Sequence, residues 1–397
     1  MTKKQTVRDL DVLGKRVFLR SDLNVPLNKD GSISDDTRIV RSLDTMRYLL
    51  DRGARVVLAS HLGRPEAKGD ASLAPVVERL RLLLPNTKIT LAPDVVGLKV
   101  DKLVKDMKDG EMLVLENVRW YKEEKKNDPG FAKTLASYAD FFVNDAFGAA
   151  HRAHASTAGI AKHIPAVAGL LVEREIKILG EAISNPRRPL TIIMGGKKVS
   201  DKIGVIEAFL PLADNIIIGG GMSYTFAKAA GGEIGSSLLD EPSLEYCGLL
   251  VKKAKTAGVN LVLPVDTVSG DGFGADVKTQ TTLTGKIPAG YMGMDLGTRA
   301  IEDFKKVIAK SGTIIWNGPM GVFEFDAFAN GTREVARAIV ESNAVSIIGG
   351  GDSAAAAVKF GLADKFAHIS TGGGASLEFF EGKELPGIAV LLDKGVV

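Results

Sequence analysis

The chain has 397 residues, which suggests two or three domains at about 150 residues each. Hydrophobic residues make up 45% of it and charged residues 25%, as in globular proteins, so a mainly disordered, collagen-like or coiled-coil chain is excluded. The formal net charge of +3 is too balanced for a general nucleic-acid binder.

Short apolar runs rich in β-branched residues alternate with helix-period segments along the chain. The runs predict strands at residues 17–20, 55–60, 88–91, 112–116, 141–144, 190–194, 215–218, 260–264, 313–316, 344–348 and 366–369. The helix-period segments are residues 35–52, 73–84, 203–212, 244–257, 301–309 and 334–341. This alternation predicts βαβ units with right-handed crossovers, and therefore parallel sheets.

About eleven strands are too many for one open sheet, so two sheets in two domains are expected. We predict an α/β protein of two Rossmann-like domains, each a parallel sheet flanked by helices, joined by a helix and hinge. The first domain spans residues 1–169, the linker 170–188 and the second domain 189–379. The linker contains a helix over residues 169–180, which two prolines in SNPRRP must end. The apolar tail, about 380–397, is predicted as a strand or an extended arm.

Four arginines are predicted near the carboxyl ends of the early strands, where open parallel sheets bind ligands. They are Arg38, Arg64, Arg119 and Arg152. A single arginine is usually a solvated surface charge, but four in this pattern indicate a small ligand with more than one anionic group. The spacing of His151 and His154 is compatible with zinc, but Arg152 between them favours an anion.

Glycine is in excess, at 44 of 397 residues, and gathers after the later strands in residues 195–196, 219–221, 349–351 and 372–374. One such loop would usually be a tight turn, but several that open helices indicate phosphate binding through backbone N–H groups. Lys198 and Lys202 are spaced to contact different phosphates of one nucleotide. Asp352 suits Mg²⁺ beside phosphates, and Glu324 suits ribose hydroxyls.

Other motifs are absent or out of context. No G-x-x-x-x-G-K-[ST] occurs, which excludes a P-loop enzyme. Residues 270–275 nearly match a dinucleotide fingerprint, but a β-branched run follows them instead of a helix, so that interpretation is rejected. Cys247 is the single cysteine, which excludes an internal disulfide. With no apolar leader and no run of 18 apolar residues, a cytoplasmic protein without membrane contact is expected.

A series of segments, in order from residue 20 to 378, resembles the motifs of phosphoglycerate kinases of bacterial type. They are RSDLNVPL, SHLGRP, NVRW, NDAFGAAHRAHAS, MGGKKVSDK, GGGM, WNGPMGVFE, GGGDS and STGGGASLE. The resemblance implies reversible, Mg²⁺-dependent phosphoryl transfer between 1,3-bisphosphoglycerate and ADP, giving 3-phosphoglycerate and ATP in glycolysis and gluconeogenesis. It implies that the N-terminal domain binds phosphoglycerate, that the C-terminal domain binds ADP or ATP, and that the tail returns to the N-terminal domain.

Matching the motifs assigns roles to residues of this chain. The expected phosphoglycerate contacts are Asp22, Asn24, Arg38, His61, Arg64, Arg119 and Arg152. The expected nucleotide contacts are Lys198, Lys202, Gly219, Gly220, Asn317, Pro319, Glu324, Gly349, Gly350, Gly351, Asp352 and Ser353. The expected catalytic groups are Arg38, Lys198, Lys202, Gly372 and Gly373, with Asp352 as the Mg²⁺ ligand. Lys197, Ala149 and Trp120 stand where the pattern commonly has Ala, Thr and Phe, and Lys197 adds a charge beside the nucleotide site.

We expect direct in-line transfer after domain closure, without a phospho-enzyme. Two alternatives stay open. One is a non-catalytic two-domain protein that closes on an anionic metabolite. The other is a Rossmann-type dehydrogenase, which the rejected fingerprint weakens. No uncharged apolar helix face stands out as an interface, so a monomer is expected, and its partners are small molecules without nucleic acid.

Overall fold

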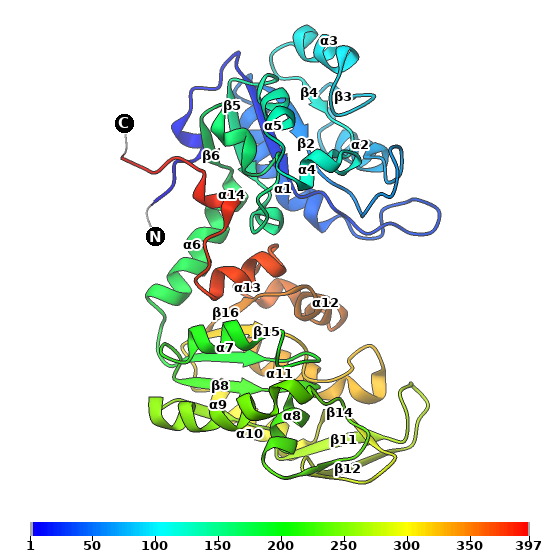
Figure 1. The fold of residues 1–397 in the computed structure, drawn as a ribbon, viewed down its shortest axis with the longest axis vertical. Helices are drawn as coiled ribbons and strands as arrows, with labels where there is room; N and C mark the ends of the chain where they lie inside the picture. The colour runs from blue at the N-terminus through cyan, green and yellow to red at the C-terminus, as the bar shows by residue number, and fades with distance from the viewer. Residues whose placement is uncertain (1–2, 396–397) are drawn as a thin grey trace. The chain divides into compact units, whose positions relative to one another are not determined.

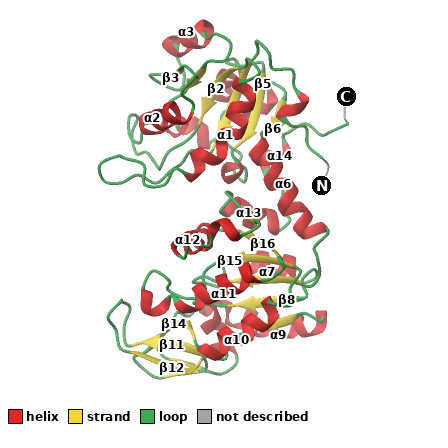
Figure 2. Ribbon diagram, turned by 180° about the vertical axis from the view of Figure 1, so that it is seen from behind, coloured by secondary structure: helices red, strands yellow, loops and turns green. Residues whose placement is uncertain are grey.

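The computed structural model describes residues 3–395, which form two compact units. Within the described residues, one unit comprises residues 3–177 and 384–395, and the other comprises Ile178–Lys383. Each unit is built on a six-stranded sheet in which every paired neighbour is parallel, with helices packed on it (Figure 2). The predicted α/β class with two parallel sheets is confirmed, and every strand predicted from the apolar runs is present in one of these sheets.

The sheet of the first unit has the strand order β3-β4-β2-β1-β5-β6. Its strands are β1 (Arg16–Ser21), β2 (Arg55–Ala59), β3 (Ile89–Leu91), β4 (Met112–Val114), β5 (Phe141–Asp145) and β6 (Ala166–Ala168). Its helices are α1 (Thr37–Leu50), α2 (Ala74–Leu83), α3 (Leu98–Asp106), α4 (Lys122–Lys125), α5 (Pro129–Ala136) and α14 (Pro386–Ala389). All residues of β1 after the first are buried, because helices cover both faces of a parallel sheet.

The C-terminal tail packs within the first unit, beside the N-terminal segment and β6 (Figure 1). The backbone of Leu392 accepts from Gln5 N–H at 2.7 Å and donates to the carbonyl of Ala166 at 2.9 Å. The prediction of a strand is wrong for α14, where Pro386 favours the first turn of a short helix. Residues 396–397 lie outside the described residues.

The sheet of the second unit has the strand order β10-β8-β7-β15-β16-β17. Its strands are β7 (Leu190–Met194), β8 (Asn215–Ile218), β10 (Asn260–Val262), β15 (Thr313–Asn317), β16 (Val345–Ile348) and β17 (His368–Ile369). Its helices are α7 (Ile203–Phe209), α8 (Met222–Ala229), α9 (Leu244–Ala257), α10 (Thr298–Ile308), α11 (Asn330–Glu341), α12 (Gly351–Lys359) and α13 (Gly374–Phe380). Trp316 of the central strand β15 is fully buried in the core.

Two small sheets in the second unit were not predicted. An antiparallel sheet consists of β11 (Asp266–Gly270), β12 (Thr279–Leu283) and β14 (Met292–Leu296), and β9 (Glu233–Ile234) pairs with β13 (Lys286–Ile287). The strand β12 alternates exposed with partly buried side chains and lacks an apolar run, so its sequence carries little strand signal. The rejected fingerprint at residues 270–275 lies at the hairpin between β11 and β12.

The predicted connecting helix is α6 (Leu170–Ser184), which begins in the first unit and continues into the second. It begins at Leu170 because side chains of the first unit accept its first N–H groups. Thr45 Oγ1 accepts from Leu170 at 2.9 Å, and Asp145 Oδ1 accepts from Leu171 at 2.9 Å. Although an anion is favoured at a helix N-terminus, complete burial raises the pKa of Asp145 to about 6.

Asp145→Asn tests this buried carboxylate. An aspartate titrates near 3.8 when exposed, so folding takes up a proton between about pH 4 and 6. As the pH rises from about 4 to 6, the unfolding free energy of the wild type should therefore fall by about 3 kcal/mol relative to that of the variant. Urea unfolding from about pH 4 to 8 measures this difference. Asp51→Asn, at an exposed position of the same unit, should keep the wild-type pH dependence. A constant difference between Asp145→Asn and wild type would contradict the assignment.

Candidate functional site

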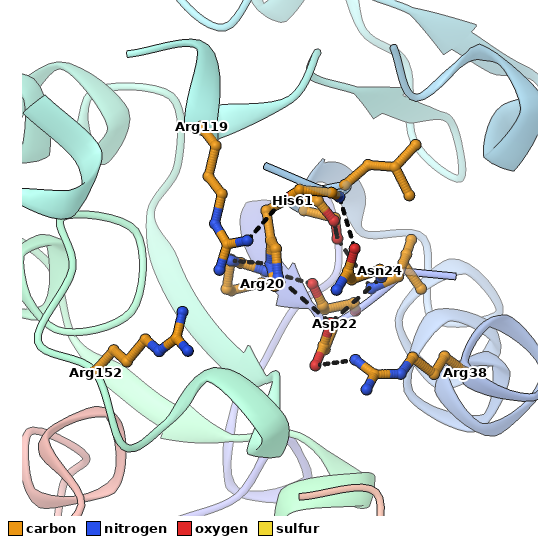
Figure 3. A network of polar contacts seen from close by, with 12 residues as sticks. Arg20, Asp22, Asn24, Arg38, His61, Arg119 and Arg152 are labelled. Atoms are coloured by element: carbon orange, nitrogen blue, oxygen red, sulfur yellow. Dashed lines mark hydrogen bonds and ion pairs between the residues drawn. The ribbon is translucent and has the colours of Figure 1, made fainter. Parts of the chain in front are cut away.

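A cluster of charged side chains lies at the carboxyl edge of the first sheet (Figure 3). Its members come from the ends of different strands and from the first turn of α1. They are Arg20, Asp22, Asn24, Arg38, His61, Arg119 and Arg152. Parallel strands all end at one edge, so the topology gathers residues that are far apart in the sequence. We call this group the arginine cluster.

Asp22 lies at the centre of the arginine cluster and is 9% exposed. Arg38 donates from NH1 to Asp22 Oδ2 at 2.6 Å, and His61 Nε2 lies 4.0 Å from Asp22 Oδ1. Asn24 Oδ1 accepts from the backbone N–H of Gly63 at 2.7 Å, which ties the loop after β1 to the loop after β2. In Figure 3, Arg38 and Arg152 lie on opposite sides of Asp22. One carboxylate thus balances only part of the positive charge around it.

His61 is held in one tautomer by Arg20. The guanidinium NH2 of Arg20 lies 3.1 Å from His61 Nδ1, and a guanidinium has only donors, so Nδ1 must accept. The ring proton is therefore on Nε2, the nitrogen nearer Asp22. Burial, together with the charges of Arg20 and Arg119, lowers the pKa of His61 well below its usual value. His61 therefore offers a neutral N–H donor at the centre of the cluster.

Arg20 is itself buried, and its charge is balanced from behind by Glu124 of α4. Arg20 Nε donates to Ser156 Oγ at 2.8 Å, and Ser156 Oγ donates to Glu124 Oε1 at 2.6 Å. Burial raises the pKa of the Glu124 carboxyl, and the nearby guanidinium of Arg20 opposes that shift. Neither residue was predicted from the sequence to belong to the site. The sequence signal for Arg20 was a charged residue in the apolar run 17–20. Glu124 gave no such signal, because it lies among other charged residues.

Arg119 and Arg152 carry positive charge that the surrounding carboxylates do not balance. Burial, with the charges of Arg152 and Arg20, lowers the pKa of Arg119 to about 10. Arg119 donates to the carbonyl of Gly63 at 2.7 Å, while Arg152 is exposed. Arg64 is also exposed and forms no hydrogen bond or ion pair with the other residues of the described chain. An anionic ligand would relieve the repulsion among these guanidinium groups.

The arrangement of the histidines does not resemble a metal centre. His154 Nδ1 lies 3.7 Å from Glu124 Oε1, and burial lowers the pKa of His154 to about 4. His151 Nε2 instead accepts from Arg152 Nε at 3.0 Å. Among residues 3–395, no three His, Cys, Asp or Glu side chains are grouped so as to hold a metal ion.

The second unit contains a cavity of about 770 Å³ at the carboxyl edge of its sheet. This volume is in the range of small-molecule sites. Many of the predicted nucleotide residues line the cavity, and they are Lys202, Gly220, Asn317, Pro319, Glu324, Gly350, Gly351, Asp352 and Ser353, with Gly373 of the predicted catalytic group. The predicted residues outside its lining are Lys198, Gly219, Gly349 and Gly372. Lys198 is exposed, and its neighbour Lys197 lines the cavity instead.

Glycine is required where two strand-end loops meet at the cavity. A Cβ on Gly195 would lie 2.1 Å from the carbonyl oxygen of Pro319. A Cβ on Gly318 would lie 2.2 Å from the carbonyl oxygen of Gly195, and Gly318 also has a φ of +98°. Any side chain would separate the loops after β7 and β15. The glycine excess here therefore allows close backbone packing as well as access to a ligand.

Two predicted ligand residues hold these loops together. Asn317, 1% exposed, accepts from Lys202 Nζ and donates to the carbonyl of Gly349. Ser353 Oγ accepts from the N–H of Gly318 at 2.6 Å. Burial lowers the pKa of Lys202. These side chains connect the loops after β15 and β16 and fix the shape of the cavity wall.

The cavity has a region with aromatic side chains, which we call its aromatic end, and it was not predicted from the sequence. Tyr224, Leu238, Phe273 and Phe325 line it, and the rings of Phe273 and Phe325 have centroids 5.2 Å apart. Phe273 is 67% exposed and belongs to the β11–β12 hairpin. An aromatic residue within the glycine-rich segment 270–275 was the only sequence signal. Aromatic side chains and polar loops in the lining of one cavity suit a ligand with a flat ring and an anionic tail.

Comparison with known proteins gives consistent matches. A family model described as "Phosphoglycerate kinase" matches residues 7–383. A phosphoglycerate kinase structure from Coxiella burnetii is 41% identical, with a TM-score of 0.88 over 98% of each chain. One from Pyrococcus horikoshii OT3 is 34% identical, with a TM-score of 0.81 over 98% of each chain.

Glu124→Ala tests the buried charge balance behind the arginine cluster. Removal of the carboxylate leaves the buried Arg20 guanidinium without the larger of its two nearby negative charges, with Asp22 remaining, which should cost about 3–5 kcal/mol of unfolding free energy. Asp106→Ala breaks an exposed pair with Lys102 and should cost less than about 0.5 kcal/mol. Urea unfolding of both variants measures the contrast. Equal losses would mean that Glu124 does not compensate a buried charge.

Proposed function

The chain belongs to the phosphoglycerate kinase family, and from that premise we propose that it catalyses reversible phosphoryl transfer between 1,3-bisphosphoglycerate and ADP. The products are 3-phosphoglycerate and ATP. The observation that carries the proposal is the pairing of an arginine cluster in one unit with a glycine-lined cavity in the other. Each has the chemistry of one of the two substrates.

The arginine cluster is proposed to bind phosphoglycerate, which carries a carboxylate and a phosphate. Arg119 and Arg152 supply guanidinium forks that match either group. His61 supplies a neutral Nε2–H donor, which adds no further charge repulsion. Arg64 is exposed, so its side chain can turn toward a ligand without breaking an interaction with the described residues.

The cavity of the second unit is proposed to bind ADP or ATP. Its aromatic end suits the base, and Glu324 is proposed to accept from ribose hydroxyls. The phosphates would lie at the loops that begin with Gly195 and Gly350, since both loops line the cavity. Lys202 is proposed to help hold them.

The cavity also fits Mg²⁺ together with a nucleotide. Asp352, in the first turn of α12, and Asp201 both line it, and protein-bound Mg²⁺ usually takes one or two carboxylates plus phosphate oxygens and water. The absence of a three-ligand group among the described residues agrees with a metal that arrives with its phosphates. When bound, Mg²⁺ would neutralise phosphate charge. Asp352 is the proposed ligand.

We propose direct in-line transfer. An oxygen of the phosphoglycerate carboxylate attacks the terminal phosphorus of ATP, the bond to the bridging oxygen breaks, and ADP leaves. Arg38 and Lys198 would stabilise the charge on the transferring group, and the N–H groups of residues 372–374 would donate to its oxygens. Closure of the two units would bring the substrates together and exclude water that would hydrolyse the acyl phosphate.

The protein is further proposed to act in the cytoplasm as a monomer, with small molecules as its partners. Within residues 3–395, no helix is long and apolar enough to cross a membrane.

Turnover of the purified chain tests the proposal. ATP consumption in the presence of 3-phosphoglycerate and Mg²⁺, with the product removed by a coupled reduction, should require all three components. Binding of ATP without turnover would favour the non-catalytic binding protein. Binding of NAD with none of ATP would favour the dehydrogenase. Either result would overturn the proposal.

Arg38→Ala tests the assignment of the transferring group. Loss of this guanidinium should lower kcat by about 100-fold or more, since it removes a charge that acts on the reacting group. The Kd for ADP should stay unchanged, because Arg38 belongs to the other unit. Arg47→Ala, on an exposed position of the same helix, should keep wild-type kcat. An effect of Arg38→Ala mainly on ATP affinity would show that the assignment is wrong.

A further inference from the structure

Lys197 occupies an unusual place on the wall of the cavity in the second unit. It is exposed, lines the cavity, and forms no hydrogen bond or ion pair with the described part of the chain. Its side chain is therefore a cation that faces the cavity without a protein partner.

The backbone of Lys197 is packed tightly although its side chain is not. A Cβ on Gly221 would lie 3.1 Å from the carbonyl oxygen of Lys197 and 3.4 Å from its Cα. The preceding carbonyl, of Gly196, accepts from Met222 N–H at 3.1 Å. The loops after β7 and β8 thus fix the point from which the lysine side chain starts. A side chain anchored in this way reaches a limited part of the cavity.

The charges that line the cavity make this lysine important. Two lysines, Lys197 and Lys202, stand against three carboxylates, which are Asp201, Glu324 and Asp352. Lys202 already donates to Asn317 and lies near Asp201 and Asp352. Lys197 therefore carries one of the two positive charges on a wall that is net negative. Unlike Lys202, it has no partner among the described residues.

We infer that Lys197 binds the phosphate chain of the nucleotide and makes the cavity favour nucleoside di- and triphosphates over nucleosides. The inference rests on the proposed nucleotide site and names one specificity-determining residue within it. Lys197 is a lining cation without a partner among the described residues, so it can contact an anion without losing an interaction, in addition to any Mg²⁺ that arrives with the phosphates. Lys198, the next residue, does not line the cavity.

The test is calorimetric titration of the full chain at low ionic strength with ADP, AMP and adenosine. Lys197→Ala should raise the Kd for ADP by about three- to tenfold and leave the Kd for adenosine unchanged. Added salt should reduce the difference from wild type, because screening weakens the lost attraction. Lys197→Arg keeps the charge and should bind ADP like the wild type. Lys252→Ala, which removes an exposed lysine of α9, should also leave the Kd unchanged.

Three results would overturn the inference. Lys197→Ala could bind ADP as wild type does, which would mean that the side chain makes no phosphate contact. Lys197→Ala could raise the Kd for adenosine as much as the Kd for ADP, which would mean that the lysine only shapes the cavity wall. Lys252→Ala could raise the Kd for ADP as much as Lys197→Ala does, which would mean that only the net charge of the protein affects binding. If the wild type binds no ADP, the proposed function fails as well, so titration of the wild type separates the two failures.

Discussion

A buried guanidinium is the constraint on which the first unit's site depends. Arg20 lies inside a strand of the central sheet, where an uncompensated charge would be severely destabilising. Glu124 and Ser156 compensate it from one side, and on the other side Arg20 fixes the tautomer of His61. The same charge therefore connects the stability of the unit to the chemistry of its surface. The arginine cluster therefore depends on a buried charge, that of Arg20, as well as on residues at the surface.

The cavity of the second unit depends on close packing of strand-end loops, whereas the site of the first unit depends on a buried charge. Its strand-end loops approach so closely that their backbones leave no room for side chains at Gly195 and Gly318. Buried Asn317 and Ser353 then connect the loops by hydrogen bonds. The result is a cavity lined by many glycines and a few charged side chains, and in the proposed function these groups would bind the nucleotide. Under the proposed function, a preorganised wall of this kind would hold a polyphosphate without large rearrangement of the loops.

Much of the fold was predictable because its signals are local. Apolar runs bounded by turn residues marked the strands of both large sheets except β6, and the proline-rich segment after α6 marked the end of that helix. The tail was harder, since an apolar stretch with Pro386 is compatible with a short helix or a strand until its neighbours are known. The small antiparallel sheet was missed because β12 is half exposed and polar.

The sequence by itself determined the α/β class and which residue types stand at the strand ends, and from these it predicted two kinds of anion site. Strands and helices follow from periodicity along the chain, and their alternation implies parallel sheets whose carboxyl ends share one edge. The order of the strands in each sheet came only from the structure. Only the tertiary structure decided which of those residues line the cavity and which are buried supports. Lys197 lines the cavity while Lys198 does not, Glu124 is linked to Arg20 through Ser156, and Phe273 lines the cavity beside Phe325. Such choices depend on side-chain direction and on burial between distant segments, and neither is encoded in spacing along one stretch of sequence.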